Sequence, residues 1–160
     1  MREMNTGSTA FIYTDINELS DVDKKLMEAA IEITKTAYAP YSGFNVGAAL
    51  LMDDDSIITG NNQENAAYPS GICAERVAIW KAGSSFPNKK IKKIAITAVS
   101  SNKQLDKPVG PCGACRQTML EYEINQAEDV EVIFMGEVGN VVKTKSIASL
   151  LPFSFDSSYL

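Results

Sequence analysis

The sequence predicts an α/β fold in which a mixed β-sheet of about five strands lies between two layers of helices, a three-layer α/β/α arrangement. The chain has 160 residues, of which 45% are hydrophobic and 22% charged, and this suits one globular domain with its own core. A predicted hairpin opens the sheet, and predicted strands and helices alternate after it. No internal repeat or low-complexity tract interrupts this order, so we expect residues 1–160 to form a single domain.

The N-terminal part of the chain predicts an arm followed by a helix. Residues 1–19 mix turn formers with a short apolar patch and show no sustained period, so we expect an N-terminal arm of uncertain order. Ser20 followed three residues later by Asp23 resembles a capping box. Apolar residues then recur at helical spacing, and the helix is expected to run to about Tyr38, before Pro40.

The later elements follow from hydrophobic period and turn residues. Strands are predicted over residues 44–52 and 56–59, which form a hairpin, and over 91–99, 130–135 and 141–144; helices are predicted from Cys73 to residue 82, over 112–122 and near 146–151. The hairpin turn carries three consecutive aspartates, whose side chains diverge at a turn tip and predict no metal site. The loop over residues 100–110 matches no motif.

Charge and cysteine content exclude several classes of function. The net charge is −5, whereas nucleic-acid affinity rests on clustered Lys and Arg, so polymeric nucleic acid is not an expected partner. No stretch approaches the roughly eighteen uninterrupted apolar residues of a membrane helix, and no basic segment with a following apolar run opens the chain. We therefore expect a cytoplasmic protein. Three cysteines in a reducing compartment indicate metal binding or catalysis rather than disulfides.

All three cysteines belong to one pattern: Cys73-Ala74-Glu75, then Pro111-Cys112-Gly113-Ala114-Cys115, in a chain without histidine. Cys112 and Cys115 lie three positions apart and so share one face of a helical turn. Cys73 and Cys112 each stand at a predicted helix start, where free backbone N–H groups favour the thiolate that binds metal. Three protein ligands leave the fourth tetrahedral position of zinc open, as in catalytic sites.

The predicted site needs positive groups and one specific helix boundary. Three thiolates around Zn²⁺ leave a net charge of about −1 before water binds. Helix N-termini, or Arg76 and Arg116 through hydrogen bonds to a sulfur, are candidates to offset that charge; the alternative for each arginine is an exposed ion pair. Residues two apart on a regular helix point to nearly opposite sides. Glu75 can therefore face the metal only if its helix begins at Cys73.

A metal ligand two residues before a glutamate, followed by P-C-x-x-C, is the signature of zinc nucleobase deaminases. Residues 38–68, GICAER at 71–76, PCGACRQ at 111–117 and LLPFSF at 150–155 resemble the small homotetrameric cytidine deaminases, over about residues 22–155. The resemblance implies one zinc per subunit, held by Cys73, Cys112 and Cys115. It also implies hydrolytic deamination of cytidine and 2′-deoxycytidine to uridine and 2′-deoxyuridine plus ammonia, in pyrimidine salvage. Zinc-bound hydroxide would attack, with Glu75 as proton shuttle.

The same resemblance implies contacts with the substrate. Phe44 packs against the pyrimidine, and the Ala74 backbone contacts the base. Asn62 and Glu64 hold the ribose hydroxyls, which suits an amide that donates and accepts and a carboxylate that accepts. From the sequence alone, turn chemistry remains the alternative for Asn62 and Glu64, and a core position the alternative for Phe44.

The resemblance further implies a homotetramer with shared active sites. Tyr68 and Phe155 are similar to residues that neighbouring subunits contribute in this family, and Phe153 is the alternative to Phe155. The N-terminal arm exceeds the family's minimal chain, and its role is open. The preference between the ribo- and deoxyribonucleoside is also open.

Three competing functions are weighed against this one. The first is a deaminase of deoxycytidylate or of an antibiotic such as blasticidin S, but a nucleotide enzyme would need a basic phosphate pocket that residues 62–68 do not offer. The second is a noncatalytic zinc-binding module, which would favour four protein ligands. The third is an RNA or DNA editing enzyme, which the acidic balance disfavours.

Overall fold

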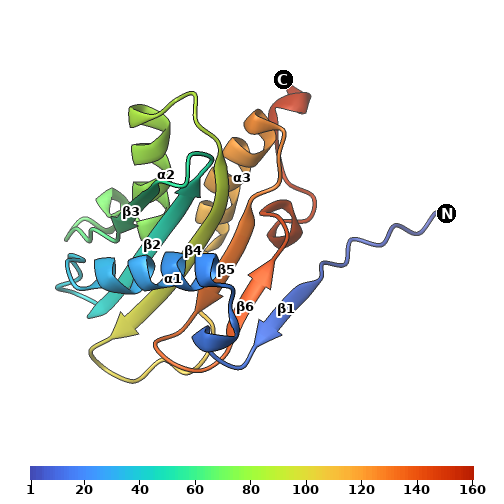
Figure 1. Ribbon diagram of the computed structural model, residues 1–160. Coiled ribbons are helices and arrows are strands. Elements are labelled where there is room, and N and C mark those ends of the chain that lie inside the picture. Colours follow the sequence, from blue (N-terminus) through green and yellow to red (C-terminus); the bar gives the residue numbers. More distant parts are fainter.

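The computed structural model describes residues 1–160 as one six-stranded sheet with three α-helices (Figure 1). The strands are β1 (Ala10–Tyr13), β2 (Phe44–Met52), β3 (Ile57–Asn61), β4 (Ile91–Ser100), β5 (Glu131–Met135) and β6 (Val141–Thr144); the helices are α1 (Asp21–Thr34), α2 (Ala74–Ser85) and α3 (Gly113–Gln126). The strand order is β1-β6-β5-β4-β2-β3. Strands β4 and β5 are parallel and all other neighbours antiparallel, so the sheet is mixed, as predicted.

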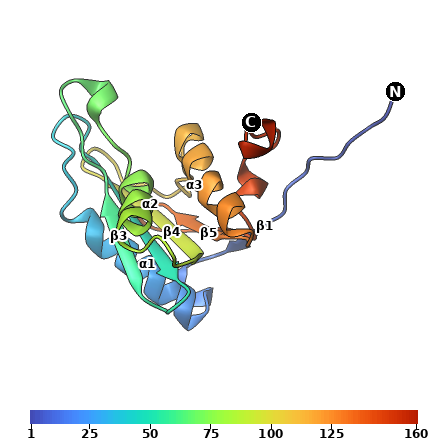
Figure 2. The same cartoon turned by 90° about the horizontal axis from the view of Figure 1, so that it is seen from above.

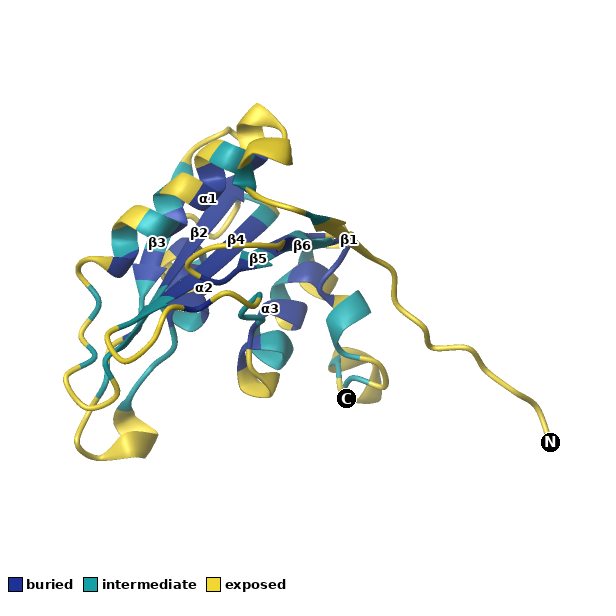
Figure 3. Cartoon of the chain, turned by 90° about the horizontal axis from the view of Figure 1, so that it is seen from below, coloured by how far each residue is buried: buried dark blue, intermediate teal, exposed yellow.

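Strand β1 is the one that the prediction of about five strands missed. It pairs antiparallel with β6 at the edge of the sheet, with Ala10 opposite Thr144 and Tyr13 opposite Val141. Residues 10–13 of the expected arm therefore belong to the sheet. Residues 1–9 have no regular secondary structure, and they are exposed and extend away from the body of the molecule (Figure 3). No helix of the structure has the length and apolar character needed to cross a membrane.

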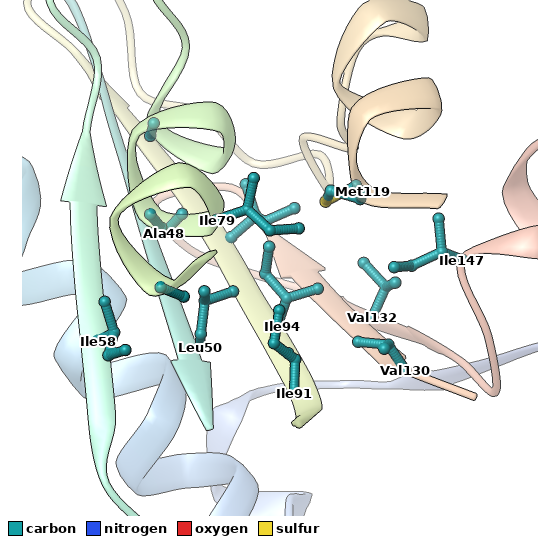
Figure 4. Close-up of a cluster of buried hydrophobic side chains, with 14 of the residues drawn as sticks. Ala48, Leu50, Ile58, Ile79, Ile91, Ile94, Met119, Val130, Val132 and Ile147 are labelled. Carbon is teal, nitrogen blue, oxygen red and sulfur yellow. The ribbon is translucent and has the colours of Figure 1, made fainter. Parts of the chain in front are cut away.

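The sheet separates two hydrophobic clusters, with α1 on one face and α2 and α3 on the other (Figure 2). Side chains alternate along β2 because successive residues of a strand point to opposite faces. Ala49 and Leu51 pack with the α1 cluster, whereas Leu50 packs in the cluster that contains Ile79 of α2 and Met119 of α3 (Figure 4). The predicted three-layer arrangement is confirmed.

Helix α1 ends at Thr34, four residues before the predicted boundary at Tyr38. The hydroxyl of Thr34 donates to the carbonyl of Ile31, so the last turn is closed by a side chain. Tyr38 instead lies beside Gln63 in an isolated parallel bridge, and its N–H donates to the carbonyl of Asn62 at 3.0 Å. The early helix end brings residues 38–42 next to β3. The short helix predicted near 146–151 is a 3-10 turn over Ala148–Leu150.

A buried carboxylate ties α1 to three strands. Asp23 is 3% exposed and lies 2.6 Å from Nζ of Lys93 on β4 and 2.8 Å from Nζ of Lys143 on β6. Both lysines also pair with Glu131 of β5. Burial alone would raise the pKa of Asp23, but hydrogen bonds from Lys143 and Lys93 outweigh it and the pKa is lowered.

Candidate active site

The N-termini of α2 and α3 lie close together on one face of the sheet. Cys73 is the N-cap of α2 and Cys112 the N-cap of α3; both have extended backbone, and neither side chain makes a capping hydrogen bond. Both thiols are therefore free to bind a ligand beyond the helix end. The prediction that the helix carrying Glu75 starts at Cys73 is confirmed, since Ala74 is its first residue.

The three cysteines form one cluster, with all Sγ atoms within 4.8 Å of one another. Sγ of Cys112 and Sγ of Cys115 are 3.5 Å apart. Tetrahedral zinc with Zn–S bonds near 2.3 Å requires sulfur separations of about 3.8 Å, so the cluster fits one ion with small adjustments. Cys115 is buried, Cys73 intermediate and Cys112 exposed, so the cluster opens to one side.

Glycine positions allow the close packing that brings the cluster together. A Cβ on Gly60 of β3 would lie 2.5 Å from the Ala78 nitrogen and 2.8 Å from the Ala74 carbonyl oxygen, so α2 rests directly on the strand backbone. A Cβ on Gly83 of α2 would lie 2.7 Å from the hydroxyl of Tyr122 on α3. These contacts hold the start of α2 against the sheet and α2 against α3.

The cluster favours a thiolate at Cys73. The hydrogen bond from the Cys115 thiol, and then the neighbouring Arg76, lower the pKa of Cys73 to about 5. Nη2 of Arg76 lies 3.6 Å from this sulfur, as predicted for a group that offsets thiolate charge. The proton shared with Cys73, together with burial, raises the pKa of Cys115. A bound metal displaces that shared proton, because only thiolates coordinate it.

Glu75 lies in the first turn of α2 and is 4% exposed. Burial raises the pKa of its carboxyl, and the negative charge of Cys73 adds to the effect. A buried carboxyl with a raised pKa takes up a proton more readily than an exposed carboxylate does. The side chain thus has the properties of a general acid–base group.

Arg116 makes contacts other than the predicted one with sulfur. Its Nε donates to the Pro111 carbonyl at 2.8 Å and its Nη1 to the Leu150 carbonyl at 3.0 Å. Both donors are thus used on backbone oxygens rather than on the cluster. The guanidinium thus bonds both the residue before Cys112 and the segment that carries Leu150.

A cavity of about 660 Å³ opens beside the cluster, a size typical of small-molecule sites. Most of the predicted site residues line it: Phe44, Asn62, Glu64, Tyr68, Cys73, Glu75, Arg76 and Cys112. Two predicted substrate contacts do not. Ala74 is fully buried in the core with its side chain away from the lining, and Phe155 is on the far C-terminal segment.

Comparison with known proteins identifies the family. Residues 20–129 match the model of the cytidine and deoxycytidylate deaminase zinc-binding region. The chain belongs to this deaminase family. The cytidine deaminase of Halalkalibacterium halodurans is 42% identical over 130 residues, which are 81% of this chain and 91% of that protein. The cytidine deaminase of Sporosarcina psychrophila is 36% identical over 140 residues, 88% of this chain and 95% of that protein.

A crystal structure of the cytidine deaminase from Burkholderia pseudomallei superposes with a TM-score of 0.72 at 36% identity. The match covers all of that chain and 86% of this one. Residues 1–19, with β1, lie outside the region matched by the family model, as do β5 and β6 beyond residue 129. The three-cysteine cluster lies inside this zinc-binding region and is positioned to hold one zinc ion.

Backbone groups hold the two polar residues of this deaminase that are predicted to bind ribose. The Asn62 amide accepts from the Val46 N–H at 2.7 Å and donates to the Phe44 carbonyl at 2.9 Å, so it extends the pairing of β2 and fixes the position of Phe44. The Glu64 carboxylate accepts from the Ser42 hydroxyl and from the N–H groups of Tyr41 and Ser42. The Ser42 hydroxyl lowers the pKa of Glu64 most, and the carboxylate is held as an anion.

Several residues of the cavity wall were not among the site residues predicted from the sequence. Tyr41 and Ser42 line it and orient Glu64, and Val109 and Gly110 line it from the loop that matches no motif. Ser42 stands next to Gly43, whose positive φ of 62° marks a tight turn. The pairing of Ser42 with Glu64 spans 22 residues, so no local pattern reveals it.

The aromatic residues predicted to act between subunits are the most exposed of the deaminase site. Tyr68 is 78% exposed in the 3-10 turn Tyr68–Ser70, at the cavity of its own chain. Phe155 is 59% exposed and stacks on Tyr159 with ring centroids 5.5 Å apart. Phe153 is more exposed still and adopts a positive φ of 57°. Phe155 thus packs against another aromatic ring of its own chain.

Proposed function

We propose that this protein hydrolyses the C4 amino group of cytidine and 2′-deoxycytidine, giving uridine or 2′-deoxyuridine and ammonia. The observation that carries the proposal is the buried Glu75 at a cavity wall beside the three-cysteine cluster. A noncatalytic zinc module has no need of a buried acid in an open cavity. Relatives named cytidine deaminase, at 36–42% identity, support the same substrate class and a role in pyrimidine salvage.

Cys73, Cys112 and Cys115 are the residues that would hold the zinc ion. Bound zinc supplies Lewis acidity, which lowers the pKa of water toward about 7 and yields a nucleophile at neutral pH. The thiolates give the site excess negative charge, and Arg76 together with the N-termini of α2 and α3 offsets it. The ligands thus come from two helix ends that the fold already brings together.

Glu75 performs the proton transfers. Its carboxylate takes a proton from the attacking water and delivers it to N3 of the cytosine ring, while the oxygen forms its bond to C4. The carboxylate then takes the remaining proton of the new C4 hydroxyl and gives it to the amino group; the C4–N bond breaks as the C4 carbonyl forms, and ammonia leaves. Burial of Glu75 raises its pKa and keeps the carboxyl able to carry the proton between these atoms.

The other cavity residues bind and orient the nucleoside. Phe44 packs against the pyrimidine, with its position fixed by the Asn62 amide. Asn62 and Glu64 bind the ribose hydroxyls, whereas Ala74 is fully buried outside the cavity lining and is left out of the proposed contacts. Arg76 is the single cationic side chain of the lining, and it is occupied by Cys73. The lining therefore offers no free cationic side chain to a nucleotide phosphate, which favours a nucleoside substrate.

The proposal extends to assembly and location. A homotetramer would cover the exposed Tyr68 and Phe155 and let subunits complete each other's sites. Three free thiols suit the reducing cytoplasm. One continuous sheet with helices on both faces supports a single domain over residues 1–160.

The test combines a zinc measurement with an activity assay on the purified protein. Loss of cytidine absorbance, with ammonia as co-product and one zinc per chain, is the expected result. Cytidine monophosphate and blasticidin S serve as comparison substrates and are expected to react poorly. No turnover of either nucleoside by protein with stoichiometric zinc would move the assignment to the noncatalytic module.

A further inference from the structure

Arg116 directly follows the last zinc ligand, and its side chain turns back along the chain. Nε donates to the carbonyl of Pro111 at 2.8 Å, and Pro111 immediately precedes Cys112. Nη1 donates to the carbonyl of Leu150 at 3.0 Å. One guanidinium thus joins the ligand segment, residues 111–115, to the tail segment, which we define as residues 146–155.

Helix α3 holds the tail segment at two further points. The buried carboxylate of Glu123 accepts from the N–H groups of Ile147 at 2.7 Å and Ala148 at 2.9 Å. The amide of Gln117 donates to the carbonyl of Phe155 at 2.9 Å. Of these three attachments, only the one made by Arg116 also reaches the ligand segment.

The ligand segment has little other support on its outer side. Cys112, Gly113 and Ala114 are exposed, and a Cβ on Gly113 would meet no atom within 4 Å. The first backbone hydrogen bond of α3 runs from the Arg116 N–H to the Cys112 carbonyl at 2.9 Å, so the carbonyl of Pro111 lies before the helix ladder. The guanidinium provides the donor that this carbonyl would otherwise lack.

We propose that Arg116 is a positioning residue that holds the ligand segment in its metal-binding conformation and couples zinc retention to the order of the tail segment. The two carbonyl bonds, rather than the positive charge, carry the effect. A planar guanidinium bonds two separate oxygens at once, whereas the single ammonium of lysine cannot reproduce that fork. The inference depends on zinc binding by the cysteine cluster and not on deamination, so a failure of the proposed activity would leave it intact.

The first test is the rate of zinc transfer from the holoprotein to a chromogenic chelator. Arg116→Lys keeps the charge and loses the fork, and Arg116→Gln loses both. Both variants are expected to release zinc about tenfold faster or more, the scale seen when a group that orients a metal ligand is removed. Zinc release from Arg116→Lys at the wild-type rate would show that charge suffices and would overturn the proposal.

The matched control is Gln117→Ala, which frees only the end of the tail segment at Phe155 and leaves both Arg116 bonds, to Pro111 and to Leu150, in place. It is expected to release zinc at the wild-type rate; faster release equal to that of Arg116→Lys would overturn the special role of Arg116.

Hydrogen exchange of the peptide over residues 147–155 tests the coupling without any substitution. Zinc removal from the wild-type protein should speed this exchange, because coupling between two sites is reciprocal. Unchanged exchange after zinc removal would overturn the coupling even if both arginine variants misfold.

Discussion

The guanidinium of Arg76 lies 3.6 Å from the sulfur of Cys73, one turn along the helix whose N-cap that cysteine forms. Its Nε atom is buried without a hydrogen-bond partner, and burying an unpaired donor costs desolvation free energy. The contact of the guanidinium with the Cys73 sulfur must offset that cost. The guanidinium also lies over the ring of Trp80, 5.9 Å from its centroid. The arginine is therefore directed at the thiolate from a fixed position.

Arg76→Gln is expected to weaken zinc binding by roughly ten- to a hundredfold, because it removes the positive charge that offsets the thiolates. Competition with a chelator of known affinity measures the effect. Lys81→Gln, on the exposed side of the same helix, is the charge-matched control and should bind zinc as the wild type does. Equal affinities of the two variants would refute the role of Arg76.

Glu75→Gln should abolish most turnover of cytidine while the zinc content stays at one per chain. Positioned acid–base catalysis contributes on the order of 10²–10⁴ in rate, and glutamine keeps the size of the side chain but cannot take up and release a proton. Steady-state kinetics and metal analysis on the same preparation measure both quantities. Loss of zinc from this variant, or near-normal activity, would contradict the assignment.

Asp23→Asn tests the ion-pair network beneath α1. We expect the free energy of unfolding to fall by about 2 kcal/mol, less than the roughly 3–5 kcal/mol of a fully buried pair, because both lysines are partly solvated. Urea unfolding at pH 7 measures the change. Asp21→Asn, exposed in the same turn, is the control and should be close to neutral.

The same pair of proteins should show a defined pH dependence. The pKa of Asp23 is lower in the folded than in the unfolded protein, so its stabilising effect is present above the unfolded pKa of about 3.9 and is lost as the pH falls through the folded pKa. The difference in unfolding free energy between wild type and Asp23→Asn should be constant near pH 7 and shrink below about pH 4. A difference that grows on acidification would contradict the ion-pair account.

Gly60→Ala should disturb the site by displacing α2 from β3, on which it packs. The added Cβ would approach the backbone of Ala74 and Ala78 at less than 3 Å, so α2 must shift away from β3, at a cost of about 1–3 kcal/mol. Because α2 carries Cys73 and Glu75, zinc affinity should fall as well. Gly113→Ala, where the Cβ has open space, should leave thermal stability unchanged or slightly higher. Equal losses of stability in the two variants would contradict the explanation that close packing of α2 requires glycine at position 60.

The parts of the site that depend on neighbouring residues in the sequence, such as the two helix starts, were predictable from the sequence. Pro111 before Cys112, and helix formers after Cys73, mark two helix starts, and the structure places both cysteines at N-caps. Long-range partners left no local signal. Ser20 and Asp23 resemble a capping box, and Ser20 does accept from the Asp23 N–H, but the Asp23 carboxylate turns instead to lysines 70 and 120 residues away.

The sixth strand escaped prediction for a related reason. Ala10–Tyr13 is four residues long, lies at the sheet edge and is mostly exposed, so it shows no hydrophobic alternation. Its partner β6 is about 130 residues later in the chain, and only the folded sheet brings the two together. The end of α1 was predicted too late because the turn that places Tyr38 beside Gln63 depends on that same tertiary contact.

Removal of residues 1–13 should separate the role of β1 from that of the site. The shortened protein is expected to keep its zinc and its turnover of cytidine, because the region matched to the family begins at residue 20. It should unfold at a lower temperature and associate with itself, because the freed edge of β6 presents unpaired backbone groups and loses the contact between Lys145 and the Phe11 ring.

Removal of residues 1–9 alone is the control, since these residues have no regular secondary structure, and it should match the full chain in calorimetry and size-exclusion chromatography. Loss of zinc or activity on removal of residues 1–13 would instead make β1 part of the catalytic unit. An unchanged melting temperature would show that pairing of Ala10–Tyr13 with β6 adds no stability. Protection of the β6 edge is the outcome that the antiparallel register favours, because each residue of β1 has a partner on β6.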